Sequence, residues 1–315
     1  MAFTNFIATA SMALFFFLLL LLLLVPSSNC MDLESHYRHK VPRSDVDLLE
    51  FPLNLEYFEA ELFLYASLGY GLDKVAPNLT MGGPSPIGAR AANLGPLIKD
   101  IILQFALQEV GHLKAIKTTV KGFPRPLLNL SAASFAKVMD NAFGHALKPP
   151  FDPYANEINF LLASYLVPYV GLTGYVGANP KLQGSVSKRL VAGLLGVESG
   201  QDAVIRALLY ERAAWEVKPY GINVAEFSDR MSELRNKLGH DGLKDEGLVV
   251  VPLHLGAEGK IKGNVLAGDK YSISYDRTPE ELLRIVYGSG DESVPGGFYP
   301  KGGNGHIARS HLRSM

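Results

Sequence analysis

Four long stretches of the chain carry apolar residues at spacings of three and four, the period of an amphipathic α-helix. These stretches cover residues 47–68, 88–121, 154–176 and 185–217. The first pair is separated from the second by a segment that contains a short helical pattern over 131–143 and five prolines: Pro124, Pro126, Pro149, Pro150 and Pro153. Strand alternation does not compete with the helical period in these stretches. The pattern predicts an all-α protein, a four-helix bundle with one long crossover.

The chain changes character after this bundle region, which we place at residues 44–218. An extension over 219–290 contains a helical pattern near 224–238 and a Gly-rich part with extended pieces over 248–251 and 271–275. Thr278 and Pro279 then begin a further helix that ends near Gly288. Residues 291–315 are rich in Gly, Ser and Pro, so we expect a disordered tail.

The first thirty residues predict a signal peptide. Residues 12–25 form an unbroken apolar run, and the small residues Ser28 and Cys30 suit a cleavage site directly after it. An uncleaved membrane anchor is the alternative, but the run is shorter than the ~20 residues that span a bilayer. We therefore expect a protein of the secretory pathway, located in the apoplast and cell wall or in the vacuole, with no membrane span after cleavage.

Composition limits the remaining options. Cys30 is the sole cysteine and lies at the expected cleavage site, so the mature core must be stable without disulfides. The formal net charge of −1 gives no reason to expect nucleic acid as a partner. Asn78 and Asn129 begin sequons and are candidate glycosylation sites.

A carboxylate and an imidazole occupy the apolar stripe of the second helix. The stripe passes through Ile101 and Phe105 to Glu109 and His112, and continues at Ile116. An ionised carboxylate in such a position is costly unless a metal or a hydrogen-bonded network compensates its charge. Glu-x-x-His spacing places both groups on one helix face, as in metal-binding bundles.

The first and fourth helices offer further acidic groups. Glu56 and Glu59 share one face of the first helix, whereas Glu61 is expected to point to solvent. Glu59 suits an interhelical ion pair better than metal ligation. Glu198 and Gln201 repeat the second-helix spacing with glutamine in place of histidine.

Long segments of the chain resemble the plant desiccation-related proteins, a group within the secreted ferritin-like family. The resemblance covers residues 44–275. Segments 53–65, 108–112, 170–175 and 197–198 match the secreted ferritin-like proteins, and segments 49–56, 82–88, 148–156, 169–182 and 232–239 are similar to the desiccation-related proteins more narrowly. It implies a ferritin-like bundle and an association with dehydration stress. It also implies that Glu56, Glu109, His112 and Glu198 match metal ligands of the family.

Two ligands of the family's pattern are absent. Gln201 stands where the fourth-helix histidine belongs, and Pro168-Tyr169 stand where the third-helix glutamate belongs. Glu157 lies about three turns away from that position. Both absent groups would serve a second metal, so the expected cofactor is either none or a single Fe, Mn or Zn ion.

Three functions remain open from the sequence. The first is a non-catalytic stress protein that keeps the bundle as a scaffold with a degenerate metal site. The second is a metal-binding oxidoreductase or metal-sequestering protein. The third is a protein that interacts with glycan or a cell-wall component through the region after Pro219, and a homo-oligomer is a further partner to test.

Overall fold

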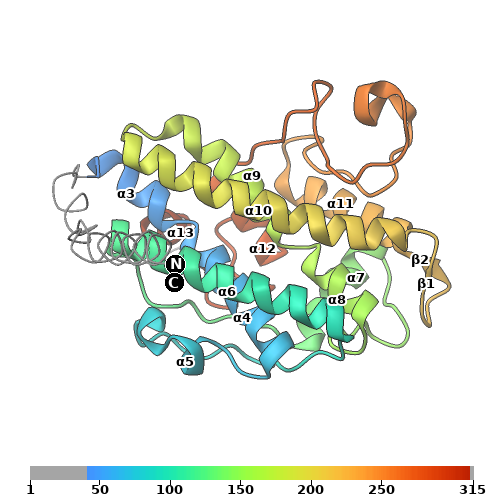
Figure 1. Ribbon diagram of the computed structural model, residues 1–315, viewed down its shortest axis with the longest axis horizontal. Coiled ribbons are helices and arrows are strands. Elements are labelled where there is room, and N and C mark those ends of the chain that lie inside the picture. Colours follow the sequence, from blue (N-terminus) through green and yellow to red (C-terminus); the bar gives the residue numbers. More distant parts are fainter. Residues whose placement is uncertain (1–40, 313–315) are drawn as a thin grey trace, which may run out of the picture. The chain divides into compact units, whose positions relative to one another are not determined.

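The computed structural model describes residues 41–312, and the predicted leader over 1–30 lies outside them. The bundle is built from α3 (Arg43–Glu50), α4 (Leu53–Leu68), α6 (Pro96–Thr119), α8 (Glu157–Ser164), α9 (Pro168–Ala178) and α10 (Ser185–Glu211). In Figure 1, α6 and α10 run along one another, α4 packs along α6, and α9 packs along α10. The predicted all-α bundle with one long crossover is confirmed.

Two of the expected helices are each divided in two. The first breaks at Phe51–Pro52 between α3 and α4, and the third breaks between α8 and α9. Pro168 is the first residue of α9, where its missing N–H removes no helical hydrogen bond. The second helix begins at Pro96, later than the expected residue 88. Proline therefore sets helix boundaries in this bundle.

The centre of the bundle is apolar except for a few charged groups. Helix α4 is buried around its whole circumference, from Leu53 to Ser67. The stretch Glu157–Lys181 is apolar and long enough to span a membrane, yet 89% of its most apolar window is buried within the protein. Its composition is that of a core helix.

The connections cover the bundle closely. After α4 come α5 (Leu72–Val75) and the 3₁₀ turn η1 (Pro77–Thr80), and the crossover contains α7 (Ala132–Phe143). Arg125 of the crossover is buried and forms an ion pair with Glu61. The expectation that Glu61 is solvated is therefore wrong, because the crossover covers that face of α4.

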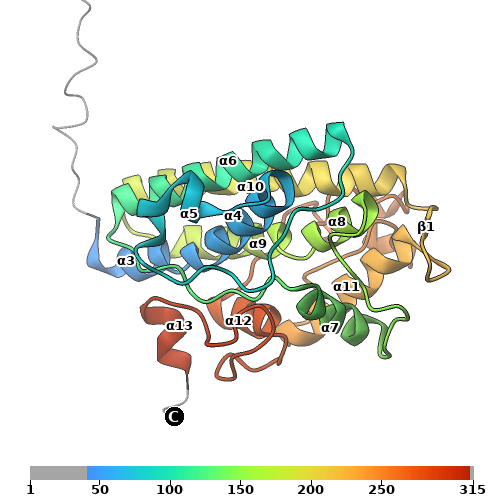
Figure 2. The ribbon, with the colours of Figure 1, turned by 90° about the horizontal axis from the view of Figure 1, so that it is seen from below.

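After α10 the chain forms a hairpin of β1 (Glu216–Val217) and β2 (Ile222–Asn223), paired Glu216 to Asn223 and Val217 to Ile222. The extension continues with α11 (Val224–Gly239), the 3₁₀ turns η3 (Leu253–Leu255) and η4 (Ala257–Gly259), and α12 (Pro279–Tyr287). A last helix, α13 (His306–His311), lies in the segment predicted to be a tail. Figure 2 shows α11, α12 and α13 on the side of α4 and α9 that faces away from α6 and α10. Helix α12 begins with the predicted cap, since Thr278 and Glu281 bond reciprocally.

The prediction of a disordered tail is wrong for residues 291–312. Phe298, Tyr299 and Ala308 are buried, and the Tyr299 hydroxyl donates to the Asn54 carbonyl at 2.8 Å. Asn304 exchanges hydrogen bonds with the side chain of Asn54. A few buried aromatic anchors therefore order a segment whose composition is typical of disorder.

The sequons differ in accessibility. Asn78 is exposed in η1, whereas Asn129 is partly buried and its Oδ1 accepts hydrogen bonds from Ser131. Glycosylation of either asparagine stays a prediction.

Candidate metal centre

Four buried side chains from three helices converge inside the bundle. Glu56 of α4, Glu109 and His112 of α6, and Glu198 of α10 place one ligand atom each within 4.8 Å of one another. The helical period explains the convergence, because each residue occupies a core position of its helix. The structure thus brings together the four residues that the sequence selected.

The geometry centres on one imidazole nitrogen. His112 Nδ1 lies 3.0 Å from Glu56 Oε2, 3.2 Å from Glu109 Oε2 and 3.3 Å from Glu198 Oε1. A single ring N–H can be directed at one of these oxygens, not at all three. Within the described residues, neither lysine nor arginine forms an ion pair with these carboxylates. Carboxyl groups therefore outnumber cationic partners in the centre.

Two further side chains hold the carboxylates in place. The Tyr175 hydroxyl donates to Glu56 Oε1, and Gln201 Nε2 donates to Glu109 Oε1 at 2.5 Å. Gln201 thus contacts the cluster from the position predicted for the missing histidine. The sequence did not predict the role of Tyr175, although this residue lies one helical turn after Gly171 on the same face of α9.

Burial dominates the protonation of the cluster. It raises the pKa of Glu59 and of Glu109 well above the usual range, and neighbouring carboxylates add to the effect. Burial also raises the pKa of Glu198 to about 7. Burial alone would raise the pKa of Glu56. The charge of His112 and hydrogen bonds to the carboxylate outweigh burial, so this pKa is lowered overall. The carboxylates in turn raise the pKa of His112 against the effect of burial.

Several buried oxygens of the cluster lack hydrogen-bond donors. They are Glu59 Oε1, Glu198 Oε1, Glu198 Oε2 and Gln201 Oε1. Buried acceptors without donors are uncommon in native proteins, and a bound cation can take the place of the absent donors. Three carboxylates and one imidazole are metal ligands that suit Fe, Mn or Zn. The residues present therefore fit a metal ion.

The other predicted groups lie beside the centre or outside it. Glu59 is buried next to the cluster, and the ion pair expected for it does not occur among the described residues. Its Oε1 is 3.6 Å from the Cβ that Gly171 would carry, an ordinary contact distance, so Glu59 packs directly against α9 at this glycine. Glu157 lies outside the centre, where its Oε2 accepts a hydrogen bond from the Gly95 amide.

Comparison with known proteins agrees with this fold. The profile of the ferritin-like domain matches residues 44–211. The chain is 64% identical to the desiccation-related protein PCC13-62 of Craterostigma plantagineum over 270 residues, which are 86% of each chain. It is 56% identical to the ferritin-like catalase Nec2 of Nesocodon mauritianus over 313 residues, which are 99% of this chain and 100% of that protein. No solved structure matches the chain.

Proposed function

Because the chain belongs to the ferritin-like domain family, we propose that it binds a transition-metal ion in the bundle core and uses it to remove hydrogen peroxide under dehydration stress. The convergence of Glu56, Glu109, His112 and Glu198 on one buried point is the observation that carries this proposal. The likeness to a catalase along nearly the whole chain supports peroxide as the substrate. The likeness to a desiccation-related protein supports the physiological setting.

The reaction balances without a further reactant, because two molecules of hydrogen peroxide give two of water and one of dioxygen. A bound redox metal would supply the electron transfer between the two peroxide molecules. The chain's own residues would hold that ion through Glu56, Glu109, His112 and Glu198. Tyr175 and Gln201 orient Glu56 and Glu109 by hydrogen bonds, so the ligands are preorganised.

The ligand set also limits the chemistry. Gln201 Nε2 is committed to Glu109, and Pro168 supplies no ligand. We expect at most one tightly bound ion per chain and no appreciable ferroxidase turnover, which depends on two metals held close together. Rapid oxygen uptake with two equivalents of ferrous iron bound would contradict this expectation.

Elemental analysis of protein purified from its native tissue is the first test. Metal-loaded protein is then assayed for dioxygen release from hydrogen peroxide, with Glu109→Gln compared against Glu157→Gln. The first variant removes a ligand charge, whereas the second neutralises a carboxylate of the same bundle outside the centre. We expect dioxygen release to be lost in Glu109→Gln alone.

Two results would overturn the proposal. Native protein without metal would favour the non-catalytic scaffold that the sequence suggested. Metal without peroxide turnover would favour sequestration.

The cellular setting is part of the proposal. The apolar leader over residues 1–30 and the exposed sequon at Asn78 support entry into the secretory pathway. Intact-mass measurement of plant-expressed protein should show the loss of about thirty residues and glycan heterogeneity. Retention of the leader in the mature protein would exclude its cleavage and favour the membrane anchor instead.

A further inference from the structure

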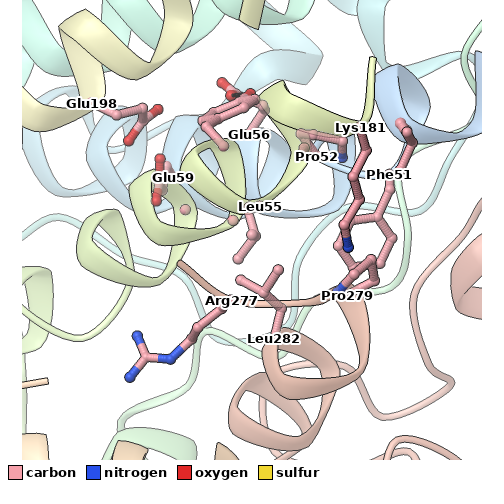
Figure 3. Close-up of a pocket in the computed structure, with 16 residues that line it drawn as sticks. Phe51, Pro52, Leu55, Glu56, Glu59, Lys181, Glu198, Arg277, Pro279 and Leu282 are labelled. Atoms are coloured by element: carbon pink, nitrogen blue, oxygen red, sulfur yellow. Dashed lines mark hydrogen bonds between the residues drawn. The ribbon is translucent and has the colours of Figure 1, made fainter. Parts of the chain in front are cut away.

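A narrow pocket leads from the metal centre toward the surface. Glu56, Glu59 and Glu198 line its inner end, and the exposed Lys181 and the partly buried Pro279 line its outer end. Its free volume is about 20 Å³, enough for a single water-sized molecule. Figure 3 shows the Glu59 and Glu198 carboxylates on one side of the pocket, with Leu55 and Leu282 pointing toward one another beyond them.

Between the carboxylates at its inner end and Lys181 at its outer end, the walls of this pocket are mainly apolar and built from closely packed helices. Helix α9 contributes Gly171, Gly174 and Gly177, whose spacing of three places them along one side of the helix. A Cβ on Gly174 would lie 2.9 Å from Leu282 Cδ1. A Cβ on Gly171 would have only ordinary contacts, 3.6 Å from Glu59 Oε1 and 3.7 Å from Glu198 Oε2. Gly174 is therefore the lining glycine that a side chain of another helix approaches most closely, whereas Gly177 lies even closer to the backbone of Arg277.

One wall comes from outside the ferritin-like domain. The domain profile ends at residue 211, whereas Leu282 belongs to α12 of the extension. The extension is fixed beside α9 because the Arg277 amide donates to the Thr173 carbonyl at 3.0 Å. Its position next to the metal centre is thus part of the fold.

We infer that Leu282 and Gly174 form the selectivity constriction of the substrate passage, which admits small uncharged molecules and excludes bulky ones. A charged or hydrated species would lose its solvation in a mainly apolar passage, which opposes its entry. Hydrogen peroxide and dioxygen are neutral and close to water in size. This inference rests on the proposed function for its substrate, but the constriction itself can be tested without turnover.

The test compares two leucines of the same helix. Leu282 and Leu283 are both buried, 3% and 2% exposed, but Leu283 does not line the pocket. Leu282→Ala and Leu283→Ala should therefore cost similar stability, and Leu282→Ala alone should widen the passage. In metal-loaded protein we expect Leu282→Ala to raise consumption of tert-butyl hydroperoxide relative to hydrogen peroxide by about ten- to hundredfold. Leu283→Ala should match the unmodified protein.

A second variant acts in the opposite direction. Gly174→Ala places a methyl group against the flexible end of Leu282 and should narrow the passage. Stopped-flow binding of nitric oxide to ferrous protein measures access without catalysis. We expect binding to slow in Gly174→Ala and to accelerate in Leu282→Ala. Equal rates in the unmodified protein, Leu282→Ala and Gly174→Ala would overturn the inference.

The metal-free protein gives an independent readout. Xenon enters apolar cavities, so crystals of Leu282→Ala under xenon pressure should show the gas between Gly174 and Glu59. Its absence there would overturn the inference even if no metal is ever bound. If the variants alter access of nitric oxide or xenon but the protein shows no peroxide turnover, the constriction is supported and the proposed function is rejected.

Discussion

Two buried charge clusters lie about two turns apart along α10, and they differ in how their charges are satisfied. The metal centre contains Glu198, whereas the second cluster contains Arg206. Both residues are almost completely buried. Burial of charge alone therefore does not distinguish a functional site from a structural one.

Arg206 of the second cluster, the arginine cluster, is saturated with hydrogen bonds. Arg206 donates to the carbonyls of Glu246, Gly247, Asn264 and Val265 and to the Tyr165 hydroxyl. Asp245 forms ion pairs with two other buried arginines, Arg235 and Arg277. These bonds join the extension to the bundle, and their number indicates a structural role.

The metal centre shows the opposite pattern. Its carboxylates outnumber its single cationic partner, several of its oxygens lack donors, and a pocket reaches it. Unsatisfied buried acceptors next to a cavity therefore mark a site that a bound ligand would complete.

The largest expected effect is the loss of stability when the arginine cluster is broken. Asp245→Ala removes the shared carboxylate and leaves Arg235 and Arg277 buried without their counter-charge. We expect the free energy of unfolding to fall by about 3–5 kcal/mol. Urea denaturation measures this loss. Asp241→Ala is the control, because the carboxylate of its ion pair with Lys244 is largely exposed; a similar loss there would contradict the assignment.

A smaller effect distinguishes the metal-free protein from the metal-bound protein. Glu109→Leu should leave the metal-free protein about as stable as before, or more stable, because it removes a buried carboxylate from an acidic cluster. Saturating metal should stabilise the unmodified protein by about 2.7 kcal/mol at a hundredfold excess over Kd, and should not stabilise the variant. Thermal unfolding with and without metal measures both. Equal stabilisation of the two proteins by metal would exclude Glu109 as a ligand.

The smallest effect is a pH dependence of the metal-free protein. Burial raises the pKa of Glu198 to about 7, above its value in the unfolded chain. Between pH about 4.5 and 7 the folded state holds a proton that the unfolded state has lost. Stability should therefore fall as pH rises through this window, by about 1.4 kcal/mol per pH unit at most for this group.

Glu198→Gln isolates that contribution. Burial also raises the pKa of Asp202, to about 6, so a residual slope of the same sign should persist in the variant. An unchanged slope in Glu198→Gln would contradict the raised pKa. In metal-saturated protein the direction should reverse, since metal binding requires deprotonated ligands.

The sequence by itself determined the helical architecture and the four converging residues. Both depend on local periodicity, because Glu109 and His112 share a helix face whatever packs against it. Glu56 and Glu198 followed from the same period on their own helices and from the family resemblance. The spacing of prolines also predicted the crossover between the second and third bundle helices.

Only the tertiary structure determined which side chains from distant segments contact these helices. Glu61 is buried because Arg125 lies across it, 64 positions away, and the tail is ordered because Tyr299 bonds Asn54, 245 positions away. The hydrogen bond from Tyr175 to Glu56 and the wall that Leu282 gives the pocket are equally long-range. Such contacts have no period in the sequence, because they arise only when the folded chain brings distant segments into one place.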